Sequence, residues 1–267
     1  MTAKIRVGAL ISGGGTNLQA IIDASRTGAI AVNMVFVGTD NPQAFGLQRA
    51  QSHGIPTFVV DYRAAIRSFK ENPAGSTLPK DFQLDQVRAK QTLFHRDADP
   101  ETVDAFLASR AVSEALLLEA MQPYAFDLLV LAGFMRNLTP YFIDRVNTDR
   151  TQPHIMNIHP ALLPAFPGTD GYGDTFRYGC KVGGCTVHFV DYGEDSGPII
   201  GQRAFPIMEG DTIDTIRRRG LEQEWQLYPE CIQLFAEGRL KLVRMTHELP
   251  GGRILERTVV KILPPRR

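Results

Sequence analysis

Short apolar runs of strand length alternate along the chain with segments whose apolar residues recur at helical spacing. The first strand is predicted over Ile5–Ile11, and the helix after it begins near Leu18. Such alternation is typical of a parallel sheet with helices on both faces, so we predict an α/β fold with a doubly wound, mostly parallel sheet. Further strands are expected at 32–38, 56–60, 128–132 and 154–158, with helices at 44–53, 100–121 and after Thr139-Pro140.

The carboxyl-terminal third is more mixed. Strands are expected at 185–190 and 199–204, on either side of an acidic loop at 191–197. A last long helix, capped by Asp211, should reach about Phe235. Two final strands, 240–245 and 254–263, are joined through Pro250-Gly251-Gly252. We expect one domain over 1–245, with halves 1–125 and 126–245, followed by a mixed extension over 246–267.

Residues 61–98 interrupt the alternation. Breakers cluster at Asn72-Pro73-Ala74-Gly75-Ser76 and Leu78-Pro79, among charged residues. We interpret this region as an insertion or mobile flap at the surface with little core, carrying one short helix near 82–93. Regular structure resumes at Asp99-Pro100, where a capping residue precedes a proline in the first helical turn.

Charge and composition exclude several classes of protein. The 267 residues include 29 basic and 29 acidic side chains, which gives no electrostatic case for binding nucleic acid or an anionic membrane. No apolar run is long enough to span a bilayer, and Met1–Leu10 lacks the features of a signal peptide, so a cytoplasmic location is expected. Three cysteines exclude a full disulfide framework, and no metal site is expected from Cys180 and Cys185 without a second pair.

The strand at 154–158 ends abruptly at His159-Pro160, because proline cannot donate to a strand ladder. Asn157 and His159 therefore stand at a carboxyl end, where open α/β sheets bind their ligands. Alternation places both side chains on one face. An amide and an imidazole side by side can stabilise a developing oxyanion, and the imidazole can move a proton. The alternative is that Asn157 caps a turn and His159 is only hydrogen-bonded within the protein.

A second motif, Ser12-Gly13-Gly14-Gly15-Thr16-Asn17, joins the first strand to the first helix. Glycines let backbone amides approach an anion, and the helix amino end adds its dipole, so the loop could cradle a phosphate. It differs from a dinucleotide fingerprint because Leu18 stands where the third glycine belongs. It also lacks the Gly-Lys-Ser/Thr of a Walker loop, and a plain glycine turn stays an alternative.

These motifs occur in one order with several others and together resemble the phosphoribosylglycinamide formyltransferases, folate-dependent enzymes of purine synthesis with a Rossmann-like fold. Asn157, His159 and Asp195 alone indicate the wider superfamily of formyl-folate transferases and hydrolases. The glycine loop followed by Leu18-Gln19-Ala20-Ile21 selects this member, and the resemblance covers about Ile5 to Val243. The remaining matched motifs are Val130-Leu131-Ala132-Gly133-Phe134-Met135-Arg136, Asn157-Ile158-His159-Pro160-Ala161-Leu162-Leu163-Pro164, Thr186-Val187-His188-Phe189-Val190 and Asp195-Ser196-Gly197-Pro198.

The resemblance implies transfer of a formyl group from 10-formyltetrahydrofolate to the amine of 5'-phosphoribosylglycinamide, by a monomer or homodimer that needs no metal. It assigns the catalytic roles to Asn157, His159 and Asp195, with Asp195 raising the His159 pKa and His188 near the site. The acceptor is expected to bind at Gly15, Thr16, Asn17 and Glu224, and Glu224 is expected to hold its sugar. The folate is expected at Met135, Arg136, Asn137, Leu138, Asn157, Asp191, Tyr192, Gly193, Glu194 and Asp195.

Two departures from the family pattern stand out. Asp170 and Tyr172 occupy a stretch that often contains a histidine, and Arg96 is the nearest candidate for the family's arginine ahead of the helix that precedes the 128–132 strand. Three alternatives therefore stay open. A hydrolase would pass the formyl group to water, but such relatives usually carry an extra amino-terminal domain before a strand like that at Ile5. A transferase could act on an amino sugar nucleotide, and a non-catalytic binding module could place a ribose on Asp40.

Overall fold

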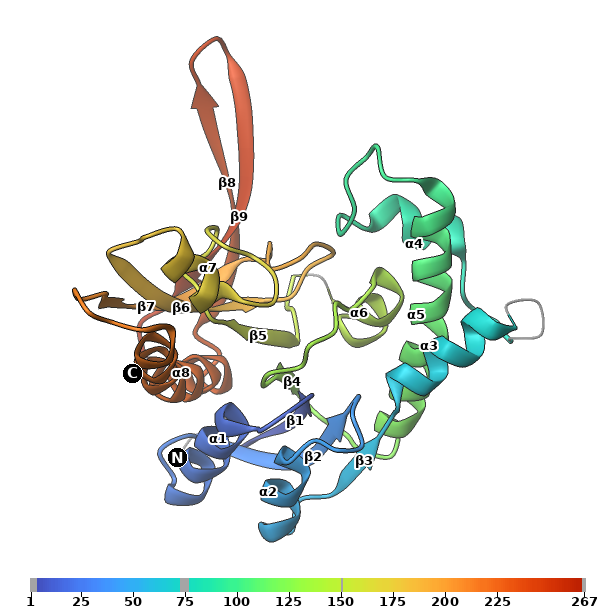
Figure 1. The fold of residues 1–267 in the computed structure, drawn as a ribbon, viewed down its shortest axis with the longest axis horizontal. Helices are drawn as coiled ribbons and strands as arrows, with labels where there is room; N and C mark the ends of the chain where they lie inside the picture. Colours follow the sequence, from blue (N-terminus) through green and yellow to red (C-terminus); the bar gives the residue numbers. More distant parts are fainter. Residues whose placement is uncertain (1–3, 73–76, 150, 266–267) are drawn as a thin grey trace.

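The computed structural model describes residues 4–72, 77–149 and 151–265 and has a central seven-stranded sheet in the order β3-β2-β1-β4-β5-β6-β7 (Figure 1). The first five strands of the chain pair in parallel, while β6 runs antiparallel to β5 and β7 to β6. The predicted doubly wound, mostly parallel sheet is therefore confirmed. Its strands are β1 (Ile5–Ile11), β2 (Val32–Thr39), β3 (Thr57–Val59), β4 (Leu128–Leu131), β5 (Ile155–His159), β6 (Val182–Phe189) and β7 (Ile199–Pro206).

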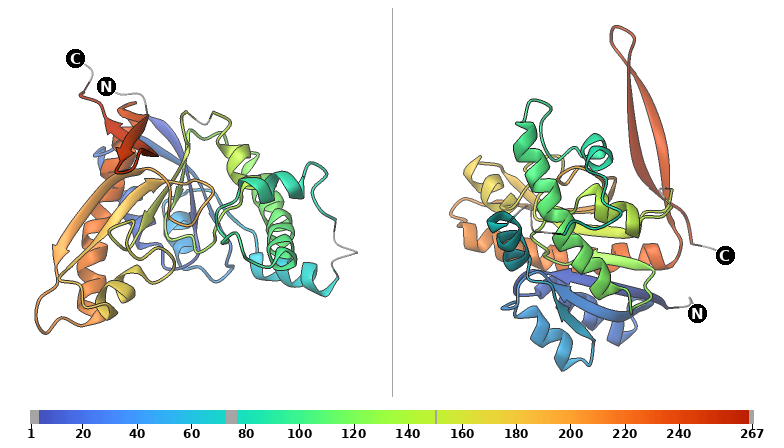
Figure 2. Two further views of the ribbon diagram at one scale, coloured as in Figure 1. Left: turned by 90° about the horizontal axis from the view of Figure 1, so that it is seen from above. Right: turned by 90° about the vertical axis from the view of Figure 1, so that its right-hand side faces the viewer.

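Helices cover both faces of the sheet, each against its own apolar core (Figures 1 and 2). Leu18, Ile22 and Tyr228 belong to the core on the face of α1, α2 and α8. Leu117 and Phe142 belong to the core on the face of α3, α5 and α6. Burial on both faces is why the central strands read as continuous apolar runs. The helices are α1 (Thr16–Thr27), α2 (Gly46–Ser52), α3 (Tyr62–Glu71), α4 (Leu84–Lys90), α5 (Pro100–Met121), α6 (Pro140–Val146), α7 (Gly171–Arg177) and α8 (Ile213–Ala236).

The short helix predicted near 82–93 is confirmed as α4, but the expectation of little core over 61–98 is only partly right. The region contains α3 as well as α4, and it contributes to a small third core. Val87 of α4 packs there with Leu107 of α5 and Tyr141 of α6, and Phe82 and Phe94 pack around them. The sequence did not reveal this packing because the region is rich in charged residues. An amphipathic helix packs through one apolar stripe, so the rest of its surface can stay charged. Residues 73–76, part of the predicted breaker stretch, lie outside the described residues.

One smaller expectation also differs from the structure. The last helix is capped by Thr212, not Asp211, because the Thr212 hydroxyl accepts from the Thr215 amide in a capping box. Asp211 instead binds the Arg219 guanidinium at 2.9 Å.

The two predicted carboxyl-terminal strands form an antiparallel hairpin, β8 (Leu240–Leu249) and β9 (Arg253–Ile262), which projects from the body (Figures 1 and 2). Its base is held by Leu240, Leu242 and Val260, which pack against the core on the α8 side. Over the described residues, none of the helices combines the length and hydropathy required to cross a membrane.

Candidate active site

A cavity of about 490 Å³ opens at the carboxyl ends of β1, β4 and β5. The chain leaves β1 toward β2 on one side and β4 toward β5 on the other, so the cavity lies at the switch point of the sheet. The predicted site residues in its lining are Asn17, Met135, Arg136, Asn137, Leu138, Asn157, His159, His188, Asp191, Gly193, Glu194, Asp195 and Glu224.

His159 has a hydrogen-bond acceptor at each ring nitrogen. Its Nδ1 lies 3.1 Å from Asp195 Oδ2, and its Nε2 lies 2.7 Å from the carbonyl oxygen of Phe166. A carbonyl and an ionised carboxylate only accept, so this arrangement favours the imidazolium form, in which both nitrogens carry protons. Burial alone would lower the pKa of His159, but the hydrogen bond and charge of Asp195 outweigh it and raise that pKa.

Asp195 is held tightly in this charged state. Burial alone would raise the pKa of its carboxyl, but the hydrogen bond and charge of the facing His159 ring hold that pKa well below its usual range. The amide of Gly168 also donates to Asp195 Oδ2 at 2.8 Å. The residue has a φ of 50°, in the left-handed region that aspartate tolerates better than most side chains. The loop backbone therefore turns sharply to bring the carboxylate to His159.

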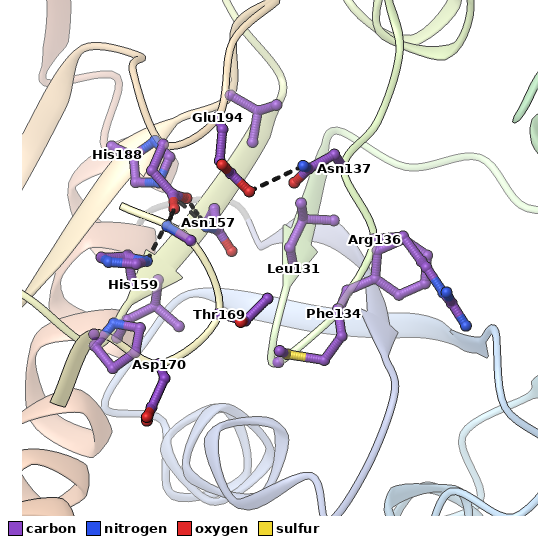
Figure 3. A pocket seen from close by; sticks show the side chains of 18 of the residues that line it. Leu131, Phe134, Arg136, Asn137, Asn157, His159, Thr169, Asp170, His188 and Glu194 are labelled. Atoms are coloured by element: carbon purple, nitrogen blue, oxygen red, sulfur yellow. Dashed lines mark hydrogen bonds and ion pairs between the residues drawn. The ribbon is translucent and has the colours of Figure 1, made fainter. Parts of the chain in front are cut away.

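The partners of Asn157 and His188 fix how both groups are oriented (Figure 3). His188 Nδ1 donates to the carbonyl of Phe189 at 2.9 Å, which leaves Nε2 as an acceptor. Asn157 Nδ2 donates to that Nε2 at 3.2 Å and more weakly to Asp195 Oδ1 at 3.4 Å. The Asn157 amide therefore presents its NH₂ group to the same carboxylate that faces His159.

Elsewhere in the cavity lining, Glu224 of α8 is 4% exposed and both its oxygens accept hydrogen bonds. Asn17 Nδ2 donates to one oxygen and the Tyr172 hydroxyl to the other, each at 2.6 Å. Burial raises the pKa of Glu224, although these two hydrogen bonds oppose the rise. Tyr172 fits here because it lies against Gly220, where any side chain would clash with its ring. The departure at Tyr172 thus brings a second donor to Glu224.

The glycine loop is placed beside the cavity, at the start of α1. Gly15 has a φ of 68°, and an added Cβ would lie 2.8 Å from the Gly46 backbone, so this position requires glycine. Ser12 Oγ accepts from the Met135 amide at 2.8 Å, which joins this loop to the 133–138 turn. Asn17 reaches the cavity lining, whereas Gly15 and Thr16 lie outside it.

The turn after β4 and the acidic loop after β6 face each other across the cavity (Figure 3). Asn137 Nδ2 donates to Glu194 Oε1 at 3.0 Å and links them. Arg136 is paired with Asp40, whose side chain is 2% exposed, at 2.5 Å. This pairing removes Asp40 from the role of a free ribose ligand. Tyr192 differs from its neighbours because it lies outside the cavity lining, and its hydroxyl donates to Asp144.

The cavity is lined by an arginine other than the expected Arg96. Arg96 is exposed and lies outside the cavity lining, whereas Arg110 of α5 lines the cavity together with Arg136. Arg110 Nε and Nη1 are buried and have no hydrogen-bond partner among the described residues. Burial lowers the pKa of Arg110. One signal could have found it: Arg110 and Glu114 lie one turn apart on a helix that is otherwise largely apolar.

Asp170, at the rim of the cavity, binds Arg177 at 2.9 Å and Arg217 at 3.0 Å. Within the described ranges, no three histidine, cysteine or acidic side chains come together as a metal ion would require. The site thus consists of polar and charged side chains gathered at the end of a doubly wound sheet.

These features define an α/β protein with a polar small-molecule site at its switch point. The family model described as Formyl transferase matches residues 5–232. The chain belongs to the formyl transferase family.

Within that family, the similar proteins share a more specific name. The phosphoribosylglycinamide formyltransferase of Escherichia coli is 33% identical over 92% of this chain and 93% of its own length. The phosphoribosylglycinamide formyltransferase of Haemophilus influenzae is 35% identical over 89% of this chain and 90% of its own length. Glycinamide ribonucleotide transformylase 1 of Symbiobacterium toebii is 37% identical with a TM-score of 0.70, over 98% of this chain and 95% of that one. The chain also matches bovine trifunctional purine biosynthetic protein adenosine-3 at 31% identity, but spans 19% of its length. The resemblance stated from the motifs is confirmed.

Proposed function

We propose that the protein transfers the formyl group of 10-formyltetrahydrofolate to the amine of 5'-phosphoribosylglycinamide. The observation that carries this proposal is the contact of one carboxylate, Asp195, with both His159 and Asn157 at the cavity wall. The names of the similar proteins support the choice of acceptor and of a folate co-substrate. The reaction belongs to the de novo synthesis of purines.

In this reaction the acceptor amine attacks the formyl carbon and a negative tetrahedral oxygen forms. Asn157 Nδ2 can donate to that oxygen in place of its long 3.4 Å contact with Asp195. Both N–H groups of His159 already have protein acceptors, so His159 contributes mainly through its positive charge. The intermediate collapses when the bond from carbon to folate nitrogen breaks, and the amine proton passes to that nitrogen through water. The chemistry proposed uses no metal and no covalent nucleophile.

The folate is proposed to bind between the turn 135–138 and the loop 191–195, which face each other across the cavity. The tail of the folate ends in carboxylates. Arg110 and Arg136 both line the cavity, and their guanidinium groups are proposed to bind these carboxylates. The unpartnered nitrogens of Arg110 favour such a use, since a buried donor without a partner is destabilising.

The acceptor is proposed to lie along the opposite side. Its phosphate would bind at Gly15 and Thr16, at the positive end of α1, and Asn17 and Glu224 would hold the sugar. Glu224 can accept hydrogen bonds from sugar hydroxyls because its present donors leave further lone pairs. The amine would then reach the formyl carbon near Asn157.

We also predict the domain organisation, the location and the oligomeric state of the protein. Residues 1–245 act as one formyltransferase domain with a carboxyl-terminal extension over 246–267. The protein works in the cytoplasm as a monomer or homodimer. The hydrolase and the amino sugar nucleotide transferase are the competing activities, and neither is favoured by a specific contact in the site.

The test is a formyl-transfer assay that offers 5'-phosphoribosylglycinamide, its dephosphorylated form, an amino sugar nucleotide or water as acceptor. We expect kcat/KM for 5'-phosphoribosylglycinamide to exceed that of each other acceptor by at least about 10²-fold, since discrimination follows transition-state binding. Equal turnover with and without the phosphate would contradict the proposal. Formate release that does not depend on any acceptor would favour the hydrolase.

A further inference from the structure

The segment after α4, in the region that interrupts the regular alternation of strand and helix, reaches the loop between β6 and β7 (Figure 1). The amide of Thr92 donates to the carbonyl of Tyr192 at 2.9 Å. At the next residue, a Cβ on Gly193 would lie 2.7 Å from the side-chain oxygen Oγ1 of Thr92, so the Thr92 side chain packs against the loop. Gly193 itself lines the active-site cavity. The segment therefore touches the outer side of a loop whose inner side faces the proposed folate.

Side chains strengthen this contact through a shared carboxylate. Lys90, the last residue of α4, binds Asp144 of α6 at 2.5 Å, and the Tyr192 hydroxyl donates to the other oxygen of Asp144. The side chains of Lys90 and Asp144 are 35% and 26% exposed, so this ion pair is partly shielded from water. Three separate elements thus meet at one point outside the cavity.

The loop needs such support because its catalytic end is conformationally demanding. Asp195 adopts a φ of 50° while its carboxylate serves His159 and Gly168. Among the described residues, the Asp191 carboxylate accepts from Gly193 and Ser196, which are neighbours in sequence. Contacts from a different part of the chain are what fix the loop relative to the sheet.

We propose that residues 84–94 are a positioning element for the 191–195 loop, which they hold in the shape that binds the folate co-substrate. Lys90 and Thr92 are its positioning residues, acting through Asp144 and Tyr192 without touching either substrate. The part that concerns the folate rests on the proposed function. The orientation of the loop does not, and can be measured without any substrate.

The matched pair of variants is Lys90→Met and Arg88→Met. Arg88 lies on the same helix and forms an ion pair of the same 2.5 Å length, but with Asp104 of α5, away from the loop. Each variant removes one positive charge and a partly exposed ion pair of 2.5 Å from α4, and Arg88→Met also removes a longer pair with Asp85 at 3.4 Å. Tyr192→Phe removes the other hydrogen bond to Asp144 and should reproduce Lys90→Met, whereas Lys90→Arg should restore the native behaviour.

The first measurement is hydrogen exchange of the amides in 191–197. We expect Lys90→Met to speed it by at least about threefold and Arg88→Met to leave it unchanged, because local opening reports the contacts that close a segment. The second is steady-state kinetics, in which Lys90→Met should raise KM for 10-formyltetrahydrofolate by about three- to tenfold and leave kcat and the acceptor KM within about twofold.

Equal exchange in the two variants would overturn the positioning role. Faster exchange with an unchanged folate KM, in an active enzyme, would overturn its link to folate binding. A native protein that transfers no formyl group would refute the proposed function instead, and the exchange data would still decide whether residues 84–94 hold the loop.

Discussion

The hydroxyl of Tyr172 donates to Glu224 Oε1 at 2.6 Å, and Tyr172 stands in the stretch that departs from the family pattern. The two residues come from α7 and α8, and Glu224 is almost completely buried. Tyr172 therefore stabilises a buried carboxylate that belongs to the proposed acceptor site.

Replacing this tyrosine tests its role in binding the acceptor. Tyr172→Phe leaves one Glu224 oxygen without a donor, which typically destabilises a protein by about 1–3 kcal/mol. We expect KM for 5'-phosphoribosylglycinamide to rise by about tenfold, with KM for the folate unchanged. Tyr178→Phe is the matched control, because Tyr178 is 80% exposed. An unchanged acceptor KM in Tyr172→Phe would show that Glu224 does not hold the sugar.

The pairing of His159 with Asp195 predicts how activity depends on pH. The raised His159 pKa keeps the ring charged at pH 6.5, so kcat should fall only as pH rises through this higher pKa. Any stability contributed by the charged ring is lost over the same rise, because only the folded state supplies the Asp195 partner. Asp195, with its lowered pKa, stays ionised throughout that range.

Asp195→Asn should move this fall in kcat to lower pH by about 1 unit or more, since burial then acts on His159 without an opposing charge. The pH profile of kcat and an NMR titration of the His159 ring provide the check. Asp81→Asn is the control, because Asp81 pairs with Arg145 at 2.5 Å outside the cavity. A profile with the same midpoint in Asp195→Asn and the native enzyme would refute the assigned pairing.

Glu114 predicts a second pH effect, on stability. This carboxyl is fully buried and accepts from the amide of Thr139 at 2.7 Å and from its hydroxyl at 2.5 Å. Burial raises the pKa of Glu114 to about 8. The folded state therefore binds one more proton than the unfolded chain between the usual glutamate pKa of 4.5 and 8, and stability must fall as pH rises across that window.

Glu114→Gln should flatten this fall, because an amide does not ionise; its oxygen can accept from the Thr139 amide while its NH₂ group donates to the Thr139 hydroxyl. Urea unfolding at several pH values measures the effect. Glu119→Gln, at an exposed position on the same helix, should keep the native slope. If Glu114→Gln also kept the native slope, Glu114 would have to be ionised in the fold.

The two arginines offer a direct comparison of the sequence expectation with the structure. Arg110→Met should raise KM for the folate by about tenfold, because a shielded guanidinium binds a carboxylate more strongly than an exposed one. Arg96→Met should have no effect on that KM. The reverse result would mean that Arg110 is buried for packing alone and that the tail of the folate lies elsewhere.

Local patterns in the sequence determined the sheet and the residues at the ends of its strands. The apolar runs predicted all seven strands and the hairpin, since burial on both faces leaves a continuous apolar signal. Pro160 marked the end of β5 and so placed Asn157 and His159, which the structure brings to the cavity lining. Motif resemblance added Asp195, Asn17 and Glu224, and each of them lies in that lining.

Only the tertiary structure decided which distant side chains meet. Asn17 and Glu224 are separated by 207 residues, and Tyr172 and Glu224 by 52, so no local period records their contacts. The same holds for Arg110, whose helix carries it to the cavity, and for the segment 84–94 beside the loop. Periodicity reports which face of an element is buried, but the partner on that face is chosen by packing across the whole fold.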